Sequence, residues 1–97
     1  MEVILDRRAQ AYVEAGGGDL YLWASSSRCC HGGLAMLRTA LERPEALEGF
    51  SRVPHPMVGV WFRGHRALTD PEQVVVELHG KRGPRLKAFW NGCVYAL

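Results

Sequence analysis

The stretch "QVVVEL", residues 73–78, decides the fold that this sequence predicts. It contains three successive valines, and a side chain that branches at Cβ favours extended backbone over helix. Two other runs, "DLYLWA" at residues 19–24 and "MVGVWF" at residues 57–62, alternate apolar side chains between two faces in the same way. The predicted strands are Leu20–Trp23, Val58–Phe62 and Val74–Leu78.

The residues before the first of these strands predict a helix. Residues 7–15, "RRAQAYVEA", are tolerant of helical structure, and Asp6 can cap the first turn. The glycines at 16–18 would end the helix. Its buried stripe would consist of Ala9, Tyr12 and Val13.

The rest of the chain adds one helix, one loop and the closing strands. Leu34, Leu37 and Leu41 have helical spacing, which predicts a second helix over residues 34–43, ended by a proline. Residues 44–56, rich in proline and glycine, predict a connecting loop. Residues 85–97 predict one or two strands broken at an Asn-Gly turn, residues 91–92.

These elements predict a single α+β domain over residues 1–97, with the helix at residues 7–15 packed on a curved, mainly antiparallel sheet. Successive side chains of a strand point to opposite faces, so every second apolar residue is expected in the core. The predicted core residues are Leu20, Leu22, Val60, Phe62, Val74, Val76 and Phe89.

Length and composition restrict the class of protein. A chain of 97 residues has room for one modest core, and 47% hydrophobic residues is ordinary for a globular protein. No apolar run approaches the ~18 residues that cross a membrane, so no membrane association is expected. The sequence also lacks a secretion leader, which predicts a cytoplasmic protein. Three cysteines cannot all pair within one chain, and a disulfide framework is not expected.

The net charge of +2 is unevenly distributed. Residues 52–97 hold seven basic and three acidic side chains, whereas residues 1–51 hold five and seven. Basic side chains in one region attract anions when they share a face, but a solvated exterior is the commoner role. Nucleic-acid binding is not expected, because no recognition motif accompanies the charge. The cations considered are Arg63, Arg66, Lys81, Arg82, Arg85 and Lys87.

Adjacent cysteines in "SSSRCCHGG", residues 25–33, mark the candidate site. They follow a predicted strand end, where binding residues commonly lie, and neighbouring glycines permit a turn. A bond between Cys29 and Cys30 would be strained, since adjacent α-carbons are ~3.8 Å apart and disulfides prefer ~5.5–6 Å. The pair therefore favours a switchable dithiol or two ligands to a soft metal. Arg28 and His31 flank it, and a nearby cation lowers a thiol pKa.

The cysteines also have a purely structural interpretation. Cysteine is often buried, and either member of the pair can be a core residue. For metal binding, Cys93 or His31 must complete the shell, because two adjacent thiolates leave a soft cation under-coordinated. The predicted catalytic residues are Cys29 and Cys30, and the predicted metal ligands are Cys29, Cys30, His31 and Cys93.

The order of these motifs resembles a known group of small bacterial proteins that carry a Cys-Cys or selenocysteine motif. The resemblance lies in residues 9–22, "AQAYVEAGGGDLYL", then the Cys-Cys pair, "VGVWF" at residues 58–62 and "VVVEL" at residues 74–78. That group is distantly similar to the HesB-like family, the fold of the A-type iron–sulfur carriers. The resemblance implies a HesB-like α+β fold and places the vicinal motif on Cys29 and Cys30.

The C-terminal part departs from the A-type carriers, which ligate iron through one mid-chain cysteine and a Cys-Gly-Cys pair. This chain ends "NGCVYAL", with Cys93 alone. The sequence therefore predicts a thiol-based redox protein or a protein that binds a soft metal ion or an iron–sulfur cluster, with a protein or thiol substrate as partner. A noncatalytic interaction domain with incidental cysteines is the alternative. A retained metal, or thiols titrating well below a pKa of ~8.5, would separate the two.

Overall fold

The structure, a computed structural model, describes residues 1–29, 32–64, 72–90 and 93–94. Its elements in chain order are β1 (Glu2–Leu5), α1 (Arg7–Ala15), β2 (Asp19–Cys29), β3 (Gly32–Ala40), β4 (Ser51–Val53), β5 (Gly59–Arg63), β6 (Gln73–His79), β7 (Arg85–Trp90) and β8 (Cys93–Val94). The three strands expected from the sequence are present in β2, β5 and β6. The closing residues form β7 and β8, and the Asn-Gly turn predicted between them lies outside the described residues.

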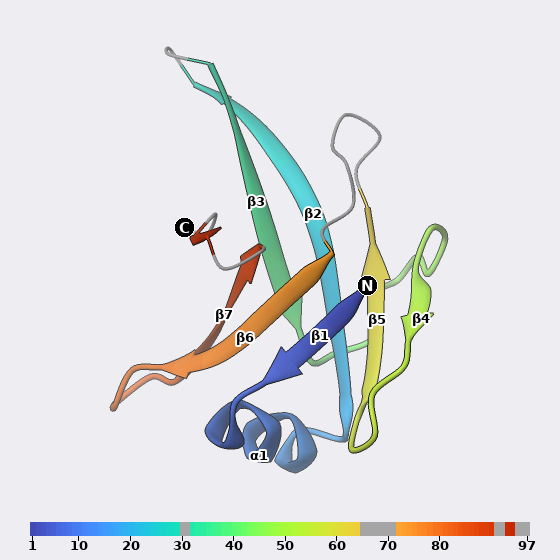
Figure 1. Cartoon of the computed structure of the whole chain (residues 1–97), viewed down its shortest axis with the longest axis vertical. Coiled ribbons are helices and arrows are strands. Elements are labelled where there is room, and N and C mark those ends of the chain that lie inside the picture. The colour runs from blue at the N-terminus through green and yellow to red at the C-terminus, as the bar shows by residue number, and fades with distance from the viewer. Residues whose placement is uncertain (30–31, 65–71, 91–92, 95–97) are drawn as a thin grey trace.

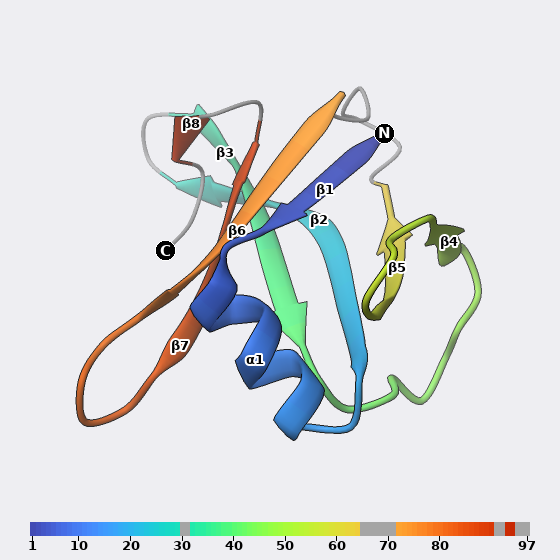
Figure 2. The same ribbon diagram turned by 60° about the horizontal axis from the view of Figure 1, so that its bottom comes forward.

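The described strands form two sheets of four strands each, in the orders β1-β6-β7-β8 and β3-β2-β5-β4. Figure 1 shows β1 and β6 crossing in front of β2 and β3, with α1 at one end of the molecule. Figure 2 brings α1 forward and shows the first sheet lying over the second. The β1–β6 and β2–β5 pairs are parallel, whereas the other four pairs are antiparallel. This arrangement confirms the predicted α+β class.

Aliphatic side chains from both sheets and from α1 form one core. Alternation along β2, β5 and β6 directs every second side chain inward, as the strand period requires. Removal of this apolar surface from water is the main force that holds the sheets together. The fully buried large side chains are Leu20, Leu22, Val13, Val60, Val74 and Val76.

One core prediction is wrong, because the alternation in β7 has the opposite phase. Phe89 is only half-buried, whereas its neighbour Ala88 has no exposed surface. Ala88 is the register partner of the buried Val76, and cross-strand partners in an antiparallel pair share a face. Phe89 therefore lies on the other face, with its ring centroid 6.1 Å from that of His79.

The first helix forms where its local signals place it. The Asp6 carboxylate accepts a hydrogen bond of 2.6 Å from the backbone N–H of Ala9, which satisfies one of the free donors of the first turn. Gly17 and Gly18 follow the helix with φ of 121° and 88°, values that favour glycine. Ala9 and Val13 of the predicted stripe are fully buried in the core, whereas Tyr12 is only half-buried.

The helix predicted over residues 34–43 is wrong, because residues 32–40 form strand β3. Its register with β2 runs without a break from Tyr21↔Ala40 to Cys29↔Gly32. The expectation that the adjacent cysteines follow the end of the strand is also wrong for Cys29, since β2 continues to that residue. Pairing between the two segments satisfies the backbone of both, which outweighs the helical spacing of the leucines.

Two short strands were not expected. β4 lies inside the predicted loop and pairs antiparallel with β5. β1 pairs with β6 in the register Val3↔Val74, and Val3 is buried in the core. Both strands are too short for a clear alternation in the sequence, and their partners lie elsewhere in the chain.

Candidate functional site

The predicted thiol site lies at the tip of the β2–β3 hairpin. Cys29 is the last residue of β2 and the register partner of Gly32, the first residue of β3. Figure 1 shows this hairpin reaching beyond the other described strands. The backbone of Cys29 therefore stands at the projecting end of a long ribbon rather than in a loop beside a short strand.

Of the other predicted metal ligands, the structure describes Cys93 but not Cys30 or His31. Cys30 and His31 lie outside the described residues, and Cys93 is the first residue of β8, paired with Trp90. Figure 1 draws β8 in red, well below the tip of the hairpin. Within the described ranges, no three His, Cys, Asp or Glu side chains gather as a metal site. The assignment of Cys29, Cys30, His31 and Cys93 as metal ligands stays a prediction.

A second candidate site lies on the outer face of the β3-β2-β5-β4 sheet, where four aromatic rings gather. Tyr21 and Trp61 are register partners with nearly parallel rings, 6.4 Å apart between centroids and 13° between planes. Phe50 packs edge-on against Tyr21 at 6.0 Å and against Trp23 at 6.4 Å. Segment 41–50 thus covers this face and leaves Tyr21 only 6% exposed. We call Tyr21, Trp23, Phe50 and Trp61 the aromatic cluster.

Two arginines stack on this cluster. The guanidinium carbon of Arg52 lies 5.7 Å from the centre of the Trp61 ring, and that of Arg63 lies 5.1 Å from the centre of the Phe50 ring. Both separations are within the ~6 Å over which a cation is attracted to a ring face. The outer face of this sheet is therefore both aromatic and cationic.

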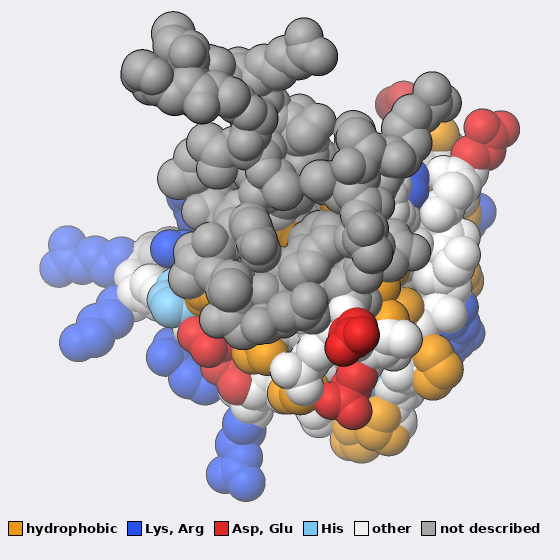
Figure 3. Space-filling model, turned by 45° about the horizontal axis from the view of Figure 1, so that its top comes forward, with side chains coloured by type: hydrophobic (Ala, Val, Ile, Leu, Met, Phe, Trp, Pro, Cys, Tyr) orange, Lys and Arg blue, Asp and Glu red, His pale blue; other side chains and the backbone are white. Residues whose placement is uncertain are grey.

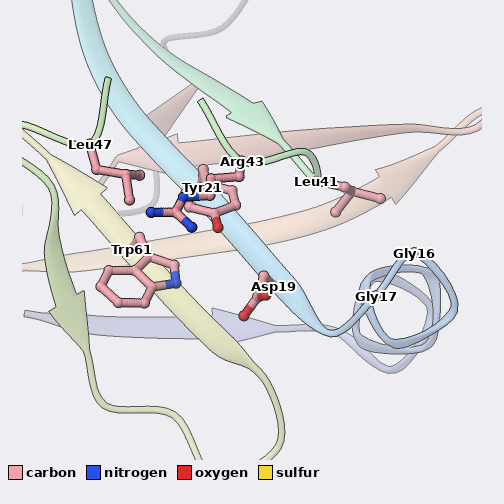
Figure 4. A pocket seen from close by; sticks show the side chains of 8 residues that line it. All are labelled: Gly16, Gly17, Asp19, Tyr21, Leu41, Arg43, Leu47 and Trp61. Carbon is pink, nitrogen blue, oxygen red and sulfur yellow. The ribbon is translucent and has the colours of Figure 1, made fainter. Parts of the chain in front are cut away.

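Beside the cluster lies a hollow of about 410 Å³. It is lined by Gly16, Gly17, Asp19, Tyr21, Leu41, Arg43, Leu47 and Trp61. Figure 4 shows the Tyr21 hydroxyl, the indole nitrogen of Trp61 and the Asp19 carboxylate turned toward the space between them, with the Arg43 guanidinium beside Tyr21. We call this space the outer hollow.

The outer hollow is assembled by pairing between distant segments. Asp19 begins β2 and is the register partner of Gly59, which begins β5. The backbone N–H of Gly59 donates a hydrogen bond of 2.8 Å to the carbonyl of Gly18. A side chain at Gly59 would overlap the carboxylate of Asp19, so the glycine leaves room for that group. Segment 41–50 then brings Arg43 to the opposite wall.

Basic side chains gather separately on the β6–β7 hairpin. Lys81, Arg82, Arg85 and Lys87 are all exposed there, on the hairpin where His79 Nε2 and Glu77 Oε1 form an exposed hydrogen bond of 3.0 Å. Figure 3 shows Lys and Arg side chains projecting together beside a histidine at one edge of the surface. Arg63 belongs to the other sheet, and Arg66 lies outside the described residues. The cations considered from the sequence are therefore divided between two regions.

The outer hollow was not predicted from the sequence, although one signal for it was present. Tyr21 and Trp61 occupy the strand positions between inward aliphatic residues, so they had to lie on the other face. Arg43 carried no comparable signal, because it was assigned to a helix. Its place depends on how segment 41–50 crosses the sheet.

Comparison with known proteins supports the fold. No protein-family model and no curated protein matches the chain. Among solved structures, the chain is similar to the crystal structure of Escherichia coli SufA, described as involved in biosynthesis of iron–sulfur clusters. The two share 12% sequence identity with a TM-score of 0.59, over 93% of this chain and 81% of SufA. The likeness confirms the HesB-like α+β fold that was predicted. The resemblance to the Cys-Cys and selenocysteine group stays a prediction.

In the described part of the chain, no helix combines the length and the apolar character needed to cross a membrane.

Proposed function

We propose that this chain is a small thiol-based redox or soft-metal-binding protein that acts through Cys29 and Cys30. The observation that carries the proposal is the place of Cys29 at the projecting end of the β2–β3 hairpin. A strand end that extends past the rest of the molecule is accessible to another macromolecule. The fold likeness to SufA, whose description concerns iron–sulfur clusters, supports the same class of chemistry.

As a redox protein, the chain would exchange a disulfide for thiols with a partner protein. One thiolate of the partner attacks the Cys29–Cys30 disulfide and releases one cysteine thiolate, which gives a mixed disulfide. The second partner thiolate then attacks the mixed disulfide, so that the partner becomes a disulfide and Cys29 and Cys30 are released as a dithiol. Two electrons and two protons pass from the partner to the pair. Because the vicinal bridge is strained, it is readily reduced in this way by a mild dithiol.

As a metal protein, the chain offers donors that fit a soft ion better than a complete iron–sulfur cluster. Clusters are commonly held by four cysteine thiolates, and the whole sequence contains three cysteines. Two thiolates with His31 or Cys93 would suit zinc or copper(I), which accept thiolate and imidazole ligands. A cluster would need His31 as a fourth ligand, or cysteines from a second copy of the chain.

The test is to purify the protein without oxygen, measure its metal and sulfide content, and count its reactive thiols. We expect either metal that is retained through gel filtration, or two thiols that disappear on mild oxidation and return with dithiothreitol. The double variant Cys29→Ser/Cys30→Ser is expected to lose this property and to keep its circular dichroism spectrum and thermal midpoint.

Cys93→Ser is the matched control. It removes one thiol from the same chain, so retention of the redox property by this variant assigns that property to the vicinal pair. Loss of metal in Cys93→Ser alone would instead place Cys93 in the metal shell. If the wild-type protein holds no metal and its thiols resist oxidation, or if the double variant unfolds, the cysteines are structural and the interaction-domain alternative holds.

A further inference from the structure

Polar groups along the outer hollow have no hydrogen-bond partner among the described residues. Tyr21 is 94% buried as a residue, but its hydroxyl oxygen is itself accessible and makes no hydrogen bond with the described residues. The indole nitrogen of Trp61 is buried and also lacks a partner there. The Tyr21 hydroxyl faces the hollow, where a ligand can reach it, whereas the Trp61 nitrogen is covered and does not meet a ligand there (Figure 4).

The charged residues of the outer hollow are equally free among the described residues. Arg43 and Asp19 both line the space and are exposed, and neither forms an ion pair or a hydrogen bond with the described part of the chain. Two opposite charges that share a hollow without pairing can each take an opposite charge from a ligand. Arg43 offers a planar set of donors suited to a carboxylate.

The balance of donors and acceptors defines the chemistry of the ligand. Arg43 and the Tyr21 hydroxyl can both donate, so the group that meets them must accept hydrogen bonds and is best negatively charged. Asp19 can only accept, and it would repel a second negative group. The ligand therefore carries one carboxylate and, beside it, a group that donates. A polyanion such as phosphate satisfies Arg43 but not Asp19.

The remaining walls set the size and character of the rest of the ligand. Leu41, Leu47 and the face of the Trp61 ring are apolar, and the volume of about 410 Å³ lies in the range of small-molecule sites, ~300–1,000 Å³. An apolar chain of a few carbons would bury against these walls. Gly16 and Gly17 close the hollow at the end of α1 without side chains.

We propose that the outer hollow binds a free α-amino acid with an apolar side chain. The carboxylate pairs with Arg43 and accepts a hydrogen bond from Tyr21, the ammonium faces Asp19, and the side chain lies against the two leucines. The site is independent of Cys29 and Cys30, so it stands or falls separately from the thiol chemistry proposed above.

The test is a titration followed by NMR of the tryptophan side-chain N–H signals. The chain has three tryptophans, and Trp61→Phe assigns the Trp61 signal by its loss while keeping an aromatic wall. L-leucine is expected to shift that signal saturably at millimolar concentration. 4-Methylpentanoate lacks the ammonium and 3-methylbutylamine lacks the carboxylate, so each is expected to bind about tenfold more weakly.

Three variants separate the two charges from general electrostatics. Arg43→Gln is expected to weaken L-leucine binding at least about tenfold, whereas Asp19→Asn should remove the preference for L-leucine over 4-methylpentanoate. Arg52→Gln is the matched control, because Arg52 stacks on Trp61 without lining the hollow, and its affinity for L-leucine should equal that of the parent.

Several results would overturn the proposal. The first is a Trp61 signal that does not move with L-leucine. The second is an equal loss of affinity in Arg43→Gln and Arg52→Gln, which would show only general charge attraction. The third is tighter binding of inorganic phosphate than of L-leucine, which would remove the role given to Asp19. Arg43 is exposed, so its substitution leaves the core intact, and Arg43→Lys provides a second variant that keeps the charge.

Discussion

The two faces of the β3-β2-β5-β4 sheet are built from the same strands and have opposite chemistry. The inner face holds Leu20, Leu22 and Val60, fully buried side chains without a polar atom. The outer face holds the aromatic cluster, in which the Trp61 indole nitrogen is buried without a partner in the described structure and the Tyr21 hydroxyl is accessible. The inner face is therefore buried and apolar, whereas the outer face also carries polar groups.

The two faces of this sheet therefore have different roles. The inner face stabilises the fold, and the outer face is available for binding. Shortening an inward aliphatic side chain lowers the free energy of unfolding, because it leaves a cavity in close-packed surroundings. Outward polar groups add little to stability while they lack a partner, and they contribute when a ligand supplies one. Substitutions on the inner face should therefore change mainly the free energy of unfolding, whereas substitutions of polar groups on the outer face should change mainly ligand binding.

The largest effect is expected on the inner face. Leu22→Ala removes a fully buried side chain and should lower the free energy of unfolding by ~2–5 kcal/mol. Urea denaturation measures the change. An unchanged denaturation midpoint would mean that the inner face does not hold the sheets together as described.

A smaller effect is expected where the covering segment approaches the outer face. Gly49 has φ of 83°, and an added Cβ would lie 3.2 Å from the side chain of Arg63. Gly49→Ala should cost ~1–2 kcal/mol, the range for left-handed backbone in a residue with a side chain. Gly83→Ala is the matched control, because that glycine has open space around it and no positive φ. Equal thermal midpoints for the two variants would contradict this account.

The contact of Arg63 with the aromatic cluster should contribute less again. Arg63→Gln removes the cation above the Phe50 ring and should lower the free energy of unfolding by ~0.5–1 kcal/mol. Urea denaturation in low and high salt tests the cause, since the loss should persist in salt if the contact is with a ring. A loss comparable to that of Leu22→Ala would make the outer face as important for stability as the inner one.

The smallest change in stability is expected for Tyr21→Phe. The hydroxyl makes no hydrogen bond with the described residues, so its removal should alter the free energy of unfolding by no more than ~0.5 kcal/mol. The same variant should weaken binding of L-leucine severalfold in the NMR titration. A large loss of stability without a change in binding would reverse the roles assigned to the two faces.

Sequence reasoning succeeded where the controlling interactions are local. The helix α1 has the predicted bounds because Asp6 caps it and Gly17 and Gly18 end it, all within a few residues. Strand β6 could be predicted because its valines favour extended backbone wherever they lie. The buried residues of β2 and β5 followed from the period of those strands.

It failed where a distant partner decides the structure. Leu34, Leu37 and Leu41 have helical spacing, but pairing with β2 holds residues 32–40 as a strand. The phase of β7 is set by the pairing of Ala88 with Val76, which no local pattern reveals. Of the thiol site, only the position of Cys29 and Cys93 on strands is described, so the roles of the cysteines remain predictions. The outer hollow required knowledge of how segment 41–50 crosses the sheet.

The parallel pairing of β1 with β6 has a consequence for how the chain is made. Glu2 and Gln73 are register partners 71 residues apart, so β1 leaves the ribosome long before its neighbour exists. At ~5–20 residues per second this interval lasts roughly 4 to 14 s. During that time Val3 and Ile4 lie in an apolar segment that lacks its strand partner, and such a segment is prone to pair with another nascent chain. A chaperone that holds the first residues of the chain should therefore raise the yield of folded protein more than one that acts after release.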